Sequence, residues 1–262
     1  MTKEMEFTFG IVTNGGDLQH LIQSIRMLQI PSTQYEIIIV GAFAPTFELK
    51  EDVVAISFDE TQKEGWITRK KNMICERAKF ENIVLMHDYM FVHPDFYTGF
   101  LKFGNDWEVC VTQIKNADGS RYRDYIFFPY YPWWKASLKR ECNKFLLPYW
   151  MKTNKYINRF QYISGSVYCV KKTTALQHPL DETLCWGQGE DVQFSNELAN
   201  HRILMKCNPY STIQFMKYKV RAFCCDTDHV EIHELKEFLD ACVELEQREP
   251  DFFTERHLHL QK

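Results

Sequence analysis

Two polar residues, His87 and Asp88, directly follow the apolar run 82-NIVLM-86, which has the pattern of a buried β-strand. Open α/β sheets bind ligands at the carboxyl ends of their strands, and a carboxylate there can hold a divalent metal that in turn holds a diphosphate. His87 would be a second metal ligand or a hydrogen-bond donor to phosphate. An aspartate that caps a turn after a strand explains the same pair without any ligand.

Cations gather just before this strand, in the stretch 63-KEGWITRKKN-72, where a helix is predicted to start. The N-terminus of a helix carries a partial positive charge, so cations in its first turns are unfavourable unless an anion lies nearby. A diphosphate would be such an anion, because helix N-termini and Lys or Arg side chains all bind it. A solvated charged face is an equally simple explanation. The four cations are Lys63, Arg69, Lys70 and Lys71.

A third polar cluster, 186-WGQGED-191, combines an indole, two glycines and two adjacent carboxylates. The glycines favour a turn, and the spacing over 192–200 predicts a helix that starts at the two acids. Carboxylates are favoured in the first turn of a helix, so a turn followed by a helix N-terminus explains the pattern without chemistry. Whether these clusters form a binding site or are ordinary turns and helix ends depends on the strands and helices that position them.

Strands and helices are predicted to alternate over the first hundred residues. The run 7-FTFGIVT-13 is apolar and β-branched, and Asp17 and Pro31 bracket a segment with leucine and isoleucine at helical spacing. Strand, helix and strand in succession form the βαβ unit of a parallel sheet. We therefore predict an α/β fold with a mostly parallel, doubly wound sheet and helices on both faces. Its first elements are strand 7–13, helix 17–30, strands 35–41 and 53–58, a helix at about 68–79 and strand 82–87.

The second half of the chain is less periodic. No repeat and no low-complexity linker divides the sequence, which favours a single domain over residues 1–262. Within it, about 1–115 would form a nucleotide-sugar-binding half and about 116–262 an acceptor-binding half with a C-terminal helix. The later predicted elements are strands at 107–114, at 161–172 with a glycine break, near 202–206 and at 212–218, and an amphipathic helix at 231–248.

Composition narrows the classes of function. The net charge is −4, so no broad basic field attracts nucleic acid. No run approaches the roughly 20 apolar residues that cross a bilayer, and the start of the sequence shows no signal peptide. The nine cysteines are scattered without a CxxC pair, which predicts reduced thiols of a cytoplasmic protein, and no grouped zinc ligands are visible.

Aromatic residues make up 15% of the chain and are concentrated at 122–135 and 145–162. This density favours a stacking surface, an interface between subunits or a membrane-facing patch. A rigid, well-packed core insertion explains it equally well. A homo-oligomer and a peripheral membrane contact therefore both stay open.

Taken in order, the motifs resemble those of glycosyltransferases of the GT-A fold, close to the large family-2 type. In that family a segment G-x(n)-R-N-x(5)-A leads into an apolar strand that ends in D-x-D and is followed by P-D-F. Galactosyltransferases of this fold also carry a very similar W-G-x-G-E-D signature, preceded by a glycine-bearing strand. The resemblance covers about residues 7 to 220. The matching residues are Gly65, Arg69, Asn72, Ala78, 82-NIVLM-86, His87-Asp88-Tyr89, Pro94-Asp95-Phe96, 164-SGSVYCVKK-172 and Glu190-Asp191.

The resemblance implies an enzyme of glycan biosynthesis, a hexosyltransferase or related transferase. It would move a sugar from a nucleotide-diphosphate sugar to a hydroxyl of a glycan or glycolipid acceptor. In inverting members the Asp of the Glu-Asp pair takes the acceptor proton, which assigns the base to Asp191 and sugar binding to Glu190. The implied donor site comprises Thr13, Asn14, Gly41, Asp59, Arg69, Asn72, His87, Asp88 and Lys217. The implied acceptor site comprises Trp133, Trp134, Gly165, Trp186 and Gly187.

The sequence departs from the family in three places. The D-x-D motif has become His87-Asp88-Tyr89, so Asp88 alone is left to hold Mn²⁺ or Mg²⁺. The second strand ends at Gly41, where the family has an acid that contacts the base, and Asp59 would substitute for it. The metal-binding histidine expected after the late strand is missing. Lys217 stands near its place and could neutralise the leaving diphosphate without a metal.

Two other classes of function stay open. The altered D-x-D motif favours a degenerate transferase fold used for binding or assembly, whereas the intact Glu-Asp motif favours an enzyme. A nucleotidyltransferase of similar topology would need a glycine-rich loop with a basic residue after the first strand. The stretch 13-TNGGDLQH-20 has the glycines but neither Lys nor Arg, so this alternative ranks lower.

Overall fold

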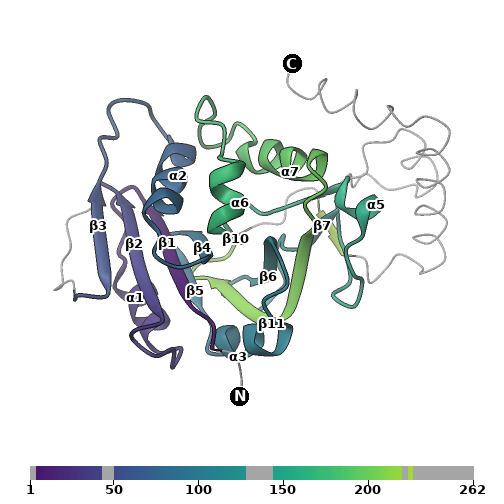
Figure 1. The fold of residues 1–262 in the computed structure, drawn as a ribbon, viewed down its shortest axis with the longest axis horizontal. Helices are drawn as coiled ribbons and strands as arrows, with labels where there is room; N and C mark the ends of the chain where they lie inside the picture. Colours follow the sequence, from purple (N-terminus) through teal and green to yellow (C-terminus); the bar gives the residue numbers. More distant parts are fainter. Residues whose placement is uncertain (1–3, 43–49, 128–143, 220–223, 227–262) are drawn as a thin grey trace.

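An eight-stranded sheet forms the centre of the computed structural model, which describes residues 4–42, 50–127, 144–219 and 224–226 (Figure 1). Its strand order is β3-β2-β1-β4-β10-β6-β11-β5. Strands β3, β2, β1 and β4 run parallel, whereas β10 runs antiparallel between β4 and β6. The strands are β1 (Phe7–Thr13), β2 (Tyr35–Gly41), β3 (Val53–Ser57), β4 (Asn82–His87), β5 (Met90–Val92), β6 (Val109–Lys115), β10 (Val167–Lys171) and β11 (Met205–Phe215).

Helices cover both faces of this sheet (Figure 1). One face packs against α1 and α3, and the other against α2, α6 and α7. None of the helices in the described part of the chain is long and apolar enough to cross a membrane. The helices are α1 (Gln19–Arg26), α2 (Ile67–Arg77), α3 (Asp95–Phe103), α5 (Lys155–Asn158), α6 (Lys172–Gln177) and α7 (Glu190–Asn200).

A second, smaller sheet is built from strands of the later part of the chain. Its strand order is β12-β8-β7-β9. Ile126, Leu146 and Tyr162 are buried together within it, with Val192 of α7 packed against them. The sheet therefore abuts the helix that carries the Glu-Asp pair. Its strands are β7 (Ile126–Phe127), β8 (Lys144–Leu146), β9 (Gln161–Tyr162) and β12 (Cys224–Asp226).

The central strands are apolar without interruption because both of their faces are buried. In β2, Ile37 and Ile39 join the core formed with α1 and α3, and the alternate residues Ile38 and Val40 join the core formed with α2. The predicted mostly parallel α/β fold is confirmed, with the first six elements close to their predicted places.

The later elements differ from the prediction. The strand predicted at 161–172 is two strands, β9 and β10, separated by a loop that contains Gly165, and α6 begins at Lys172. The strands predicted near 202–206 and at 212–218 are one strand, β11, whose pairing with β6 is irregular between Asn208 and Thr212. Pro209, which lacks an N–H to donate, lies at this irregularity. The helix predicted at 231–248 lies outside the described residues.

Candidate active site

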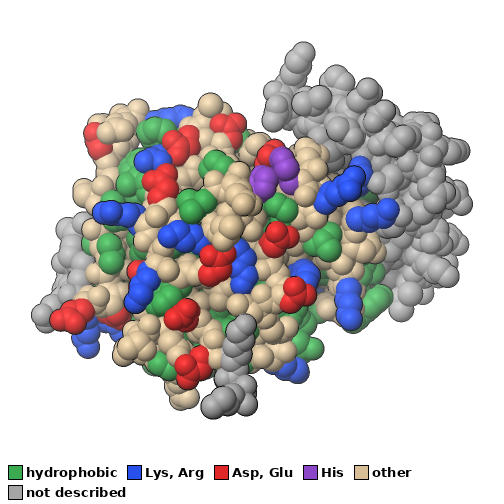
Figure 2. Space-filling view, viewed as in Figure 1, with side chains coloured by type: hydrophobic (Ala, Val, Ile, Leu, Met, Phe, Trp, Pro, Cys, Tyr) green, Lys and Arg blue, Asp and Glu red, His purple; other side chains and the backbone are tan. Residues whose placement is uncertain are grey.

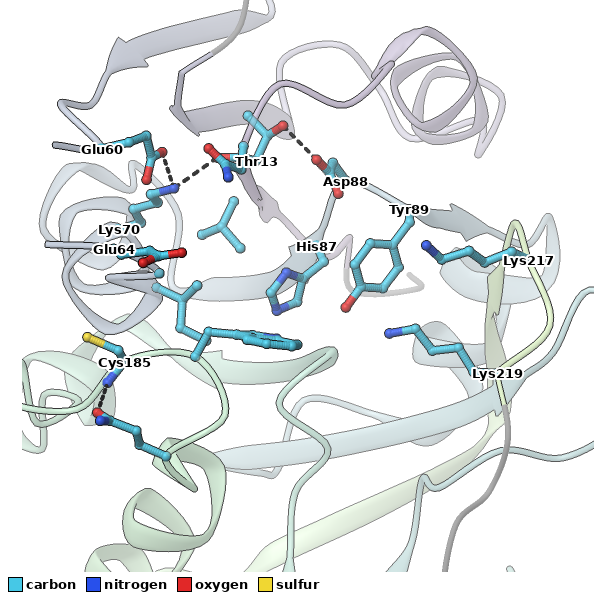
Figure 3. Close-up of a pocket in the computed structure, with 16 residues that line it drawn as sticks. Thr13, Glu60, Glu64, Lys70, His87, Asp88, Tyr89, Cys185, Lys217 and Lys219 are labelled. Atoms are coloured by element: carbon cyan, nitrogen blue, oxygen red, sulfur yellow. Dashed lines mark hydrogen bonds and ion pairs between the residues drawn. The ribbon is translucent and has the colours of Figure 1, made fainter.

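A cavity of about 760 Å³ opens where β1 and β4 end at the same edge of the sheet (Figure 3). Thr13 and Asn14 line it from the end of β1, and His87 and Asp88 line it from the end of β4. Its volume is in the usual range for a small-molecule site. The carboxyl ends of parallel strands thus gather four of the predicted donor-site residues, as expected for an open α/β sheet.

Asp88 is held in place by the loop that follows β1. Its Oδ2 accepts a hydrogen bond of 2.6 Å from Thr13 Oγ1, and Thr13 Oγ1 in turn accepts bonds from the N–H groups of Gly15 and Gly16 at 3.2 Å each. The loop passes so close that a Cβ on Gly16 would lie 2.5 Å from Asp88 Oδ2. The carboxylate is therefore fixed before any ligand binds.

Two lysines that follow β11, Lys217 and Lys219, point into this cavity from the other side (Figure 3). Their ammonium groups lie 5.4 and 3.9 Å from the ring centroid of Tyr89. Burial lowers the pKa of Lys219 to about 8, with Lys217 and Arg123 adding to the shift and Asp88 opposing it. Within the described part of the chain neither ammonium group pairs with a carboxylate, and two neighbouring cations of this kind suit an anionic ligand such as a diphosphate.

The surroundings of His87 favour the neutral form of its imidazole. Its pKa is lowered well below its usual value, first because the ring is buried and then because Lys71 and Lys219 repel its charged form. The ring stacks on Tyr89 with 5.2 Å between centroids. His87 can therefore donate one hydrogen bond to a ligand, but it adds no positive charge.

A second cavity, of about 380 Å³, adjoins the first and contains the two acids of the sequence motif. Gly165, Gly187, Glu190 and Asp191 line it. The cavities share a wall made by four side chains, so a ligand in one lies next to a ligand in the other. The shared residues are His87, Tyr89, Trp186 and Lys219.

The Glu-Asp pair sits in the first turn of α7, as the sequence predicts. Gly189 precedes it with φ of 77°, a backbone conformation that favours glycine. Asp191 Oδ2 accepts a hydrogen bond of 3.1 Å from the N–H of Gly165, and a Cβ on Gly165 would lie 2.7 Å from Glu190 Oε1. A side chain in place of Gly165 would therefore push against the two carboxylates where the loop before β10 meets them.

Lys71 lies behind the acids and is fully buried. Its ammonium group donates to the carbonyl oxygen of Gly165 at 2.9 Å and lies 3.8 Å from Glu190 Oε1. Burial raises the pKa of Glu190, and Lys71 opposes that rise. Burial also lowers the pKa of Lys71, and Glu190 and Asp191 oppose that shift. Glu190 is thus one half of a buried ion pair, whereas Asp191 is only half-buried.

Arg69 and Asn72 point away from the cavities and fasten α2 to the loop at 180–184. Arg69 pairs with Glu182 at 3.1 Å and with Glu76 at 2.8 Å. Asn72 Nδ2 donates to the carbonyl oxygen of Leu180 at 2.9 Å, and its Oδ1 accepts from the N–H of Leu180 at 3.0 Å. This loop leads into Trp186, so the two residues position the motif without lining the donor cavity.

The remaining predicted residues have varied surroundings. Asp59 is exposed and accepts hydrogen bonds from Thr61, while its neighbour Glu60 lines the cavity and pairs with Lys70. Gly41 packs against the backbone of β1, since a Cβ there would lie 2.1 Å from the carbonyl oxygen of Thr13. Trp133 and Trp134 lie outside the described residues. Their role in acceptor binding stays a prediction.

The sequence interpretation missed Lys219 and assigned Lys71 to a diphosphate rather than to a carboxylate, although each residue leaves a signal in the sequence. Lys219 follows Lys217 at the spacing that puts two side chains on one face of an extended chain. Lys71 lies on the apolar stripe of α2, between Ile67 and Ile74. A lysine at such a position needs a buried partner, and the partner here is Glu190.

No protein-family model matches the sequence, and no curated protein matches it. Among solved structures, the fold is similar to GalNAc-T7 with UDP, GalNAc and Mn²⁺, with a TM-score of 0.56 and 13% identity over 85% of this chain and 45% of that one. It is also similar to S. aureus TarS 1–349, with a TM-score of 0.51 and 13% identity over 79% of this chain and 60% of that one. A complex of TarS 1–349 with UDP-GlcNAc gives a TM-score of 0.52 and 14% identity over 82% and 60%.

The chain thus spans between 45% and 60% of the length of these three structures. The likeness shows the fold of a GT-A glycosyltransferase.

Proposed function

We propose that this protein is an inverting glycosyltransferase that transfers a sugar from a nucleoside-diphosphate sugar to a hydroxyl of a glycan or glycolipid. The observation that carries the proposal is the pair of adjoining cavities with unlike chemistry. One has lysines at the carboxyl edge of the sheet, and the other has the Glu190–Asp191 pair. A diphosphate leaving group suits the first, and an acceptor hydroxyl that must lose a proton suits the second.

Asp191 is the group that would take the acceptor proton. The acceptor oxygen forms a bond to the anomeric carbon while the bond from that carbon to the diphosphate breaks, and the hydroxyl proton moves to the Asp191 carboxylate. Gly165 holds one oxygen of this carboxylate through its N–H at 3.1 Å. Glu190 would hold a sugar hydroxyl rather than take the proton, because its side chain is buried and its carboxylate is already paired with Lys71.

The leaving diphosphate would be neutralised by Lys217 and Lys219. The fold implies Mn²⁺ or Mg²⁺ at this place, but the described side chains suit a divalent cation poorly. The end of β4 offers one carboxylate, Asp88, which already accepts a hydrogen bond from Thr13. Lysines stand where a metal-binding histidine was expected, and they repel a cation. We therefore expect less dependence on a metal than a complete D-x-D site shows.

A panel of nucleotide sugars tests the function. The protein's melting temperature is measured with each of them, and release of the nucleoside diphosphate is followed with and without glycan acceptors. We expect at least one nucleoside-diphosphate sugar to raise the melting temperature and to be turned over. Stabilisation without turnover by any acceptor or by water would favour the degenerate binding protein instead. No stabilisation by any of them would contradict the proposed donor site.

If Lys217 and Lys219 hold the diphosphate, as a pair that we call the lysine clamp, a nucleoside diphosphate should bind without a metal. The dissociation constant for UDP should change by no more than ~3-fold between excess chelator and Mn²⁺. Replacing both lysines, Lys217→Met with Lys219→Met, should weaken binding at least ~10-fold, the scale of one lost charge-assisted hydrogen bond. Calorimetric titration measures both, and Lys79→Met, on an exposed lysine between α2 and β4, is the matched control. Binding that is abolished by chelator but unaffected by the two substitutions would show a metal site in place of the clamp.

The pKa of Lys219 predicts how binding depends on pH. Because this pKa is lowered to about 8, the ammonium group is charged at pH 7 and loses its proton as the pH rises toward 9. UDP affinity should therefore fall across this interval. The fall should disappear in Lys219→Met and move to higher pH in Lys217→Met, because Lys217 contributes to the lowered pKa of Lys219. Affinity of the wild type that stays constant from pH 7 to 9 would remove Lys219 from the clamp.

A further inference from the structure

Three side chains that take no part in the proposed reaction meet at the surface where α6 and α7 end. They are His178, Glu197 and His201, and one ligand atom from each lies within 4.8 Å of the other two. Figure 2 shows histidine side chains gathered on the face above these helices. We propose that they bind a transition-metal ion of the Zn²⁺ class, at a site separate from the two cavities.

The distances suit a small metal ion. Nδ1 of His178 lies 3.6 Å from Glu197 Oε1, and Nδ1 of His201 lies 3.2 Å from the same oxygen. Tetrahedral zinc with bonds of about 2.0–2.1 Å holds its ligand atoms about 3.4 Å apart. Two edges of the coordination polyhedron are therefore already present. The imidazole rings lie 4.3 Å apart between centroids, and their ligand atoms lie within 4.8 Å of each other, so the third edge would close by rotation of the rings.

The helices place the ligands where a cation is favoured. Glu197 and His201 are four residues apart, so they share one face of α7. His201 directly follows the last residue of α7, and the C-terminal end of a helix carries a partial negative charge. His178 occupies the corresponding position after α6. A metal would thus join the ends of two helices through side chains that their termini already bring together.

The donor set selects the kind of ion. Two imidazoles and one carboxylate suit Zn²⁺ and its neighbours Co²⁺ and Ni²⁺, whereas Mg²⁺ prefers oxygen ligands alone. His201 Nδ1 also lies 3.0 Å from the carbonyl oxygen of Glu197, which can accept its proton while no metal is bound. The side chain of His201 is 51% exposed, which leaves a path for the ion from solvent.

A bound ion should restrain the C-terminal end of α7 by linking it to α6. The helix starts at Glu190 and ends next to His201, and His178 would tie its far end to α6. An ion that binds the folded protein and not the unfolded chain stabilises the fold in proportion to the logarithm of its concentration above the dissociation constant. This inference does not depend on the proposed glycosyl transfer, because it concerns neither cavity.

The test uses the full chain after treatment with chelator. Zn²⁺ is titrated by calorimetry and by melting temperature, and Co²⁺ reports the ligand type through its absorption spectrum. We expect one high-affinity site, a raised melting temperature and a Co²⁺ spectrum without a thiolate band. His201→Ala and Glu197→Gln should each weaken Zn²⁺ binding at least ~10-fold. Loss of a residue that only orients a metal ligand already weakens binding by about this factor, and loss of the ligand itself should weaken it no less. His20→Ala, on an exposed histidine of α1, is the matched control.

Circular dichroism of each variant shows that the fold is retained, which is expected for these surface positions. Equal Zn²⁺ affinity in His201→Ala, Glu197→Gln and the His20 control would overturn the proposal. A thiolate band in the Co²⁺ spectrum that survives both substitutions would do the same, since the ion would then be bound by cysteines. Failure of the wild type to bind Zn²⁺ would also exclude the site, whatever the outcome of the glycosyl-transfer assays.

Discussion

Asp191→Asn is expected to lower the turnover of sugar transfer at least ~10²-fold, the usual scale for loss of a general base. The substitution keeps the shape of the side chain and its ability to accept the hydrogen bond from Gly165. It removes the basic lone pair that takes the acceptor proton. Donor affinity should stay nearly unchanged, because Asp191 does not line the cavity that contains Lys217 and Asp88.

The measurement compares initial rates of product formation with donor dissociation constants for the variant and the wild type. Asp106→Asn supplies the control, as it makes the same substitution at a fully exposed aspartate that pairs with Lys206. Near-normal turnover in Asp191→Asn would exclude this residue as the base. A parallel loss of donor affinity would instead indicate that the substitution disturbs the whole site.

Lys71→Met is expected to reduce the free energy of unfolding by about 3 kcal/mol at pH 8, since removing one partner of a buried ion pair leaves the other uncompensated. The variant leaves Glu190 without its cation and the carbonyl oxygen of Gly165 without its donor. Denaturant titration measures the loss. Lys79→Met, the same change on an exposed lysine that follows α2, should stay within about 0.5 kcal/mol of the wild type.

The loss should depend on pH with a definite sign. Burial already raises the pKa of Glu190, and without Lys71 only hydrogen bonds from the backbone oppose that rise. A carboxyl group whose pKa is higher in the folded protein binds its proton more tightly there, so stability falls as the pH rises above the unfolded value. Lys71→Met should therefore be less destabilising at pH 5 than at pH 8. Adding Glu190→Gln to it should restore part of the stability.

A loss of under 1 kcal/mol that is the same at pH 5 and pH 8 would show that the pair does not stabilise the fold. Additive effects of the two substitutions would show the same, because interacting neighbours deviate from additivity.

The first half of the fold could be predicted because its signals are local. Each of β1, β2 and β4 is a short apolar run, and Leu21, Ile22 and Ile25 of α1 stand at helical spacing. The position of β10, antiparallel between β4 and β6, could not be predicted in the same way. Its partners Ile83 and Val109 lie far from it in sequence, and pairing over such separations leaves no periodic signal.

The site residues also divide into those with a local signal in the sequence and those whose role depends on contacts with distant residues. Asp88 and the Glu-Asp pair follow a strand and open a helix, so their positions can be read from neighbouring residues. Lys71 owes its role to Gly165, which is 94 residues away, and only the folded chain brings them together. Arg69 resembled a phosphate ligand by spacing, but the structure gives it Glu182 as a partner from a loop more than a hundred residues on.

The position of Trp186 between the two cavities affects the order in which the substrates bind. Its side chain is 71% exposed, belongs to the walls of both cavities, and is followed by Gly187 with φ of 79°. A side chain that two ligands touch makes their affinities interdependent, and each must change the other's by the same factor. A bound donor that holds the indole in one position therefore raises or lowers the affinity of the acceptor for its cavity. We expect the two substrates to add in a preferred sequence, with the acceptor's apparent affinity depending on how much of the protein already carries the donor.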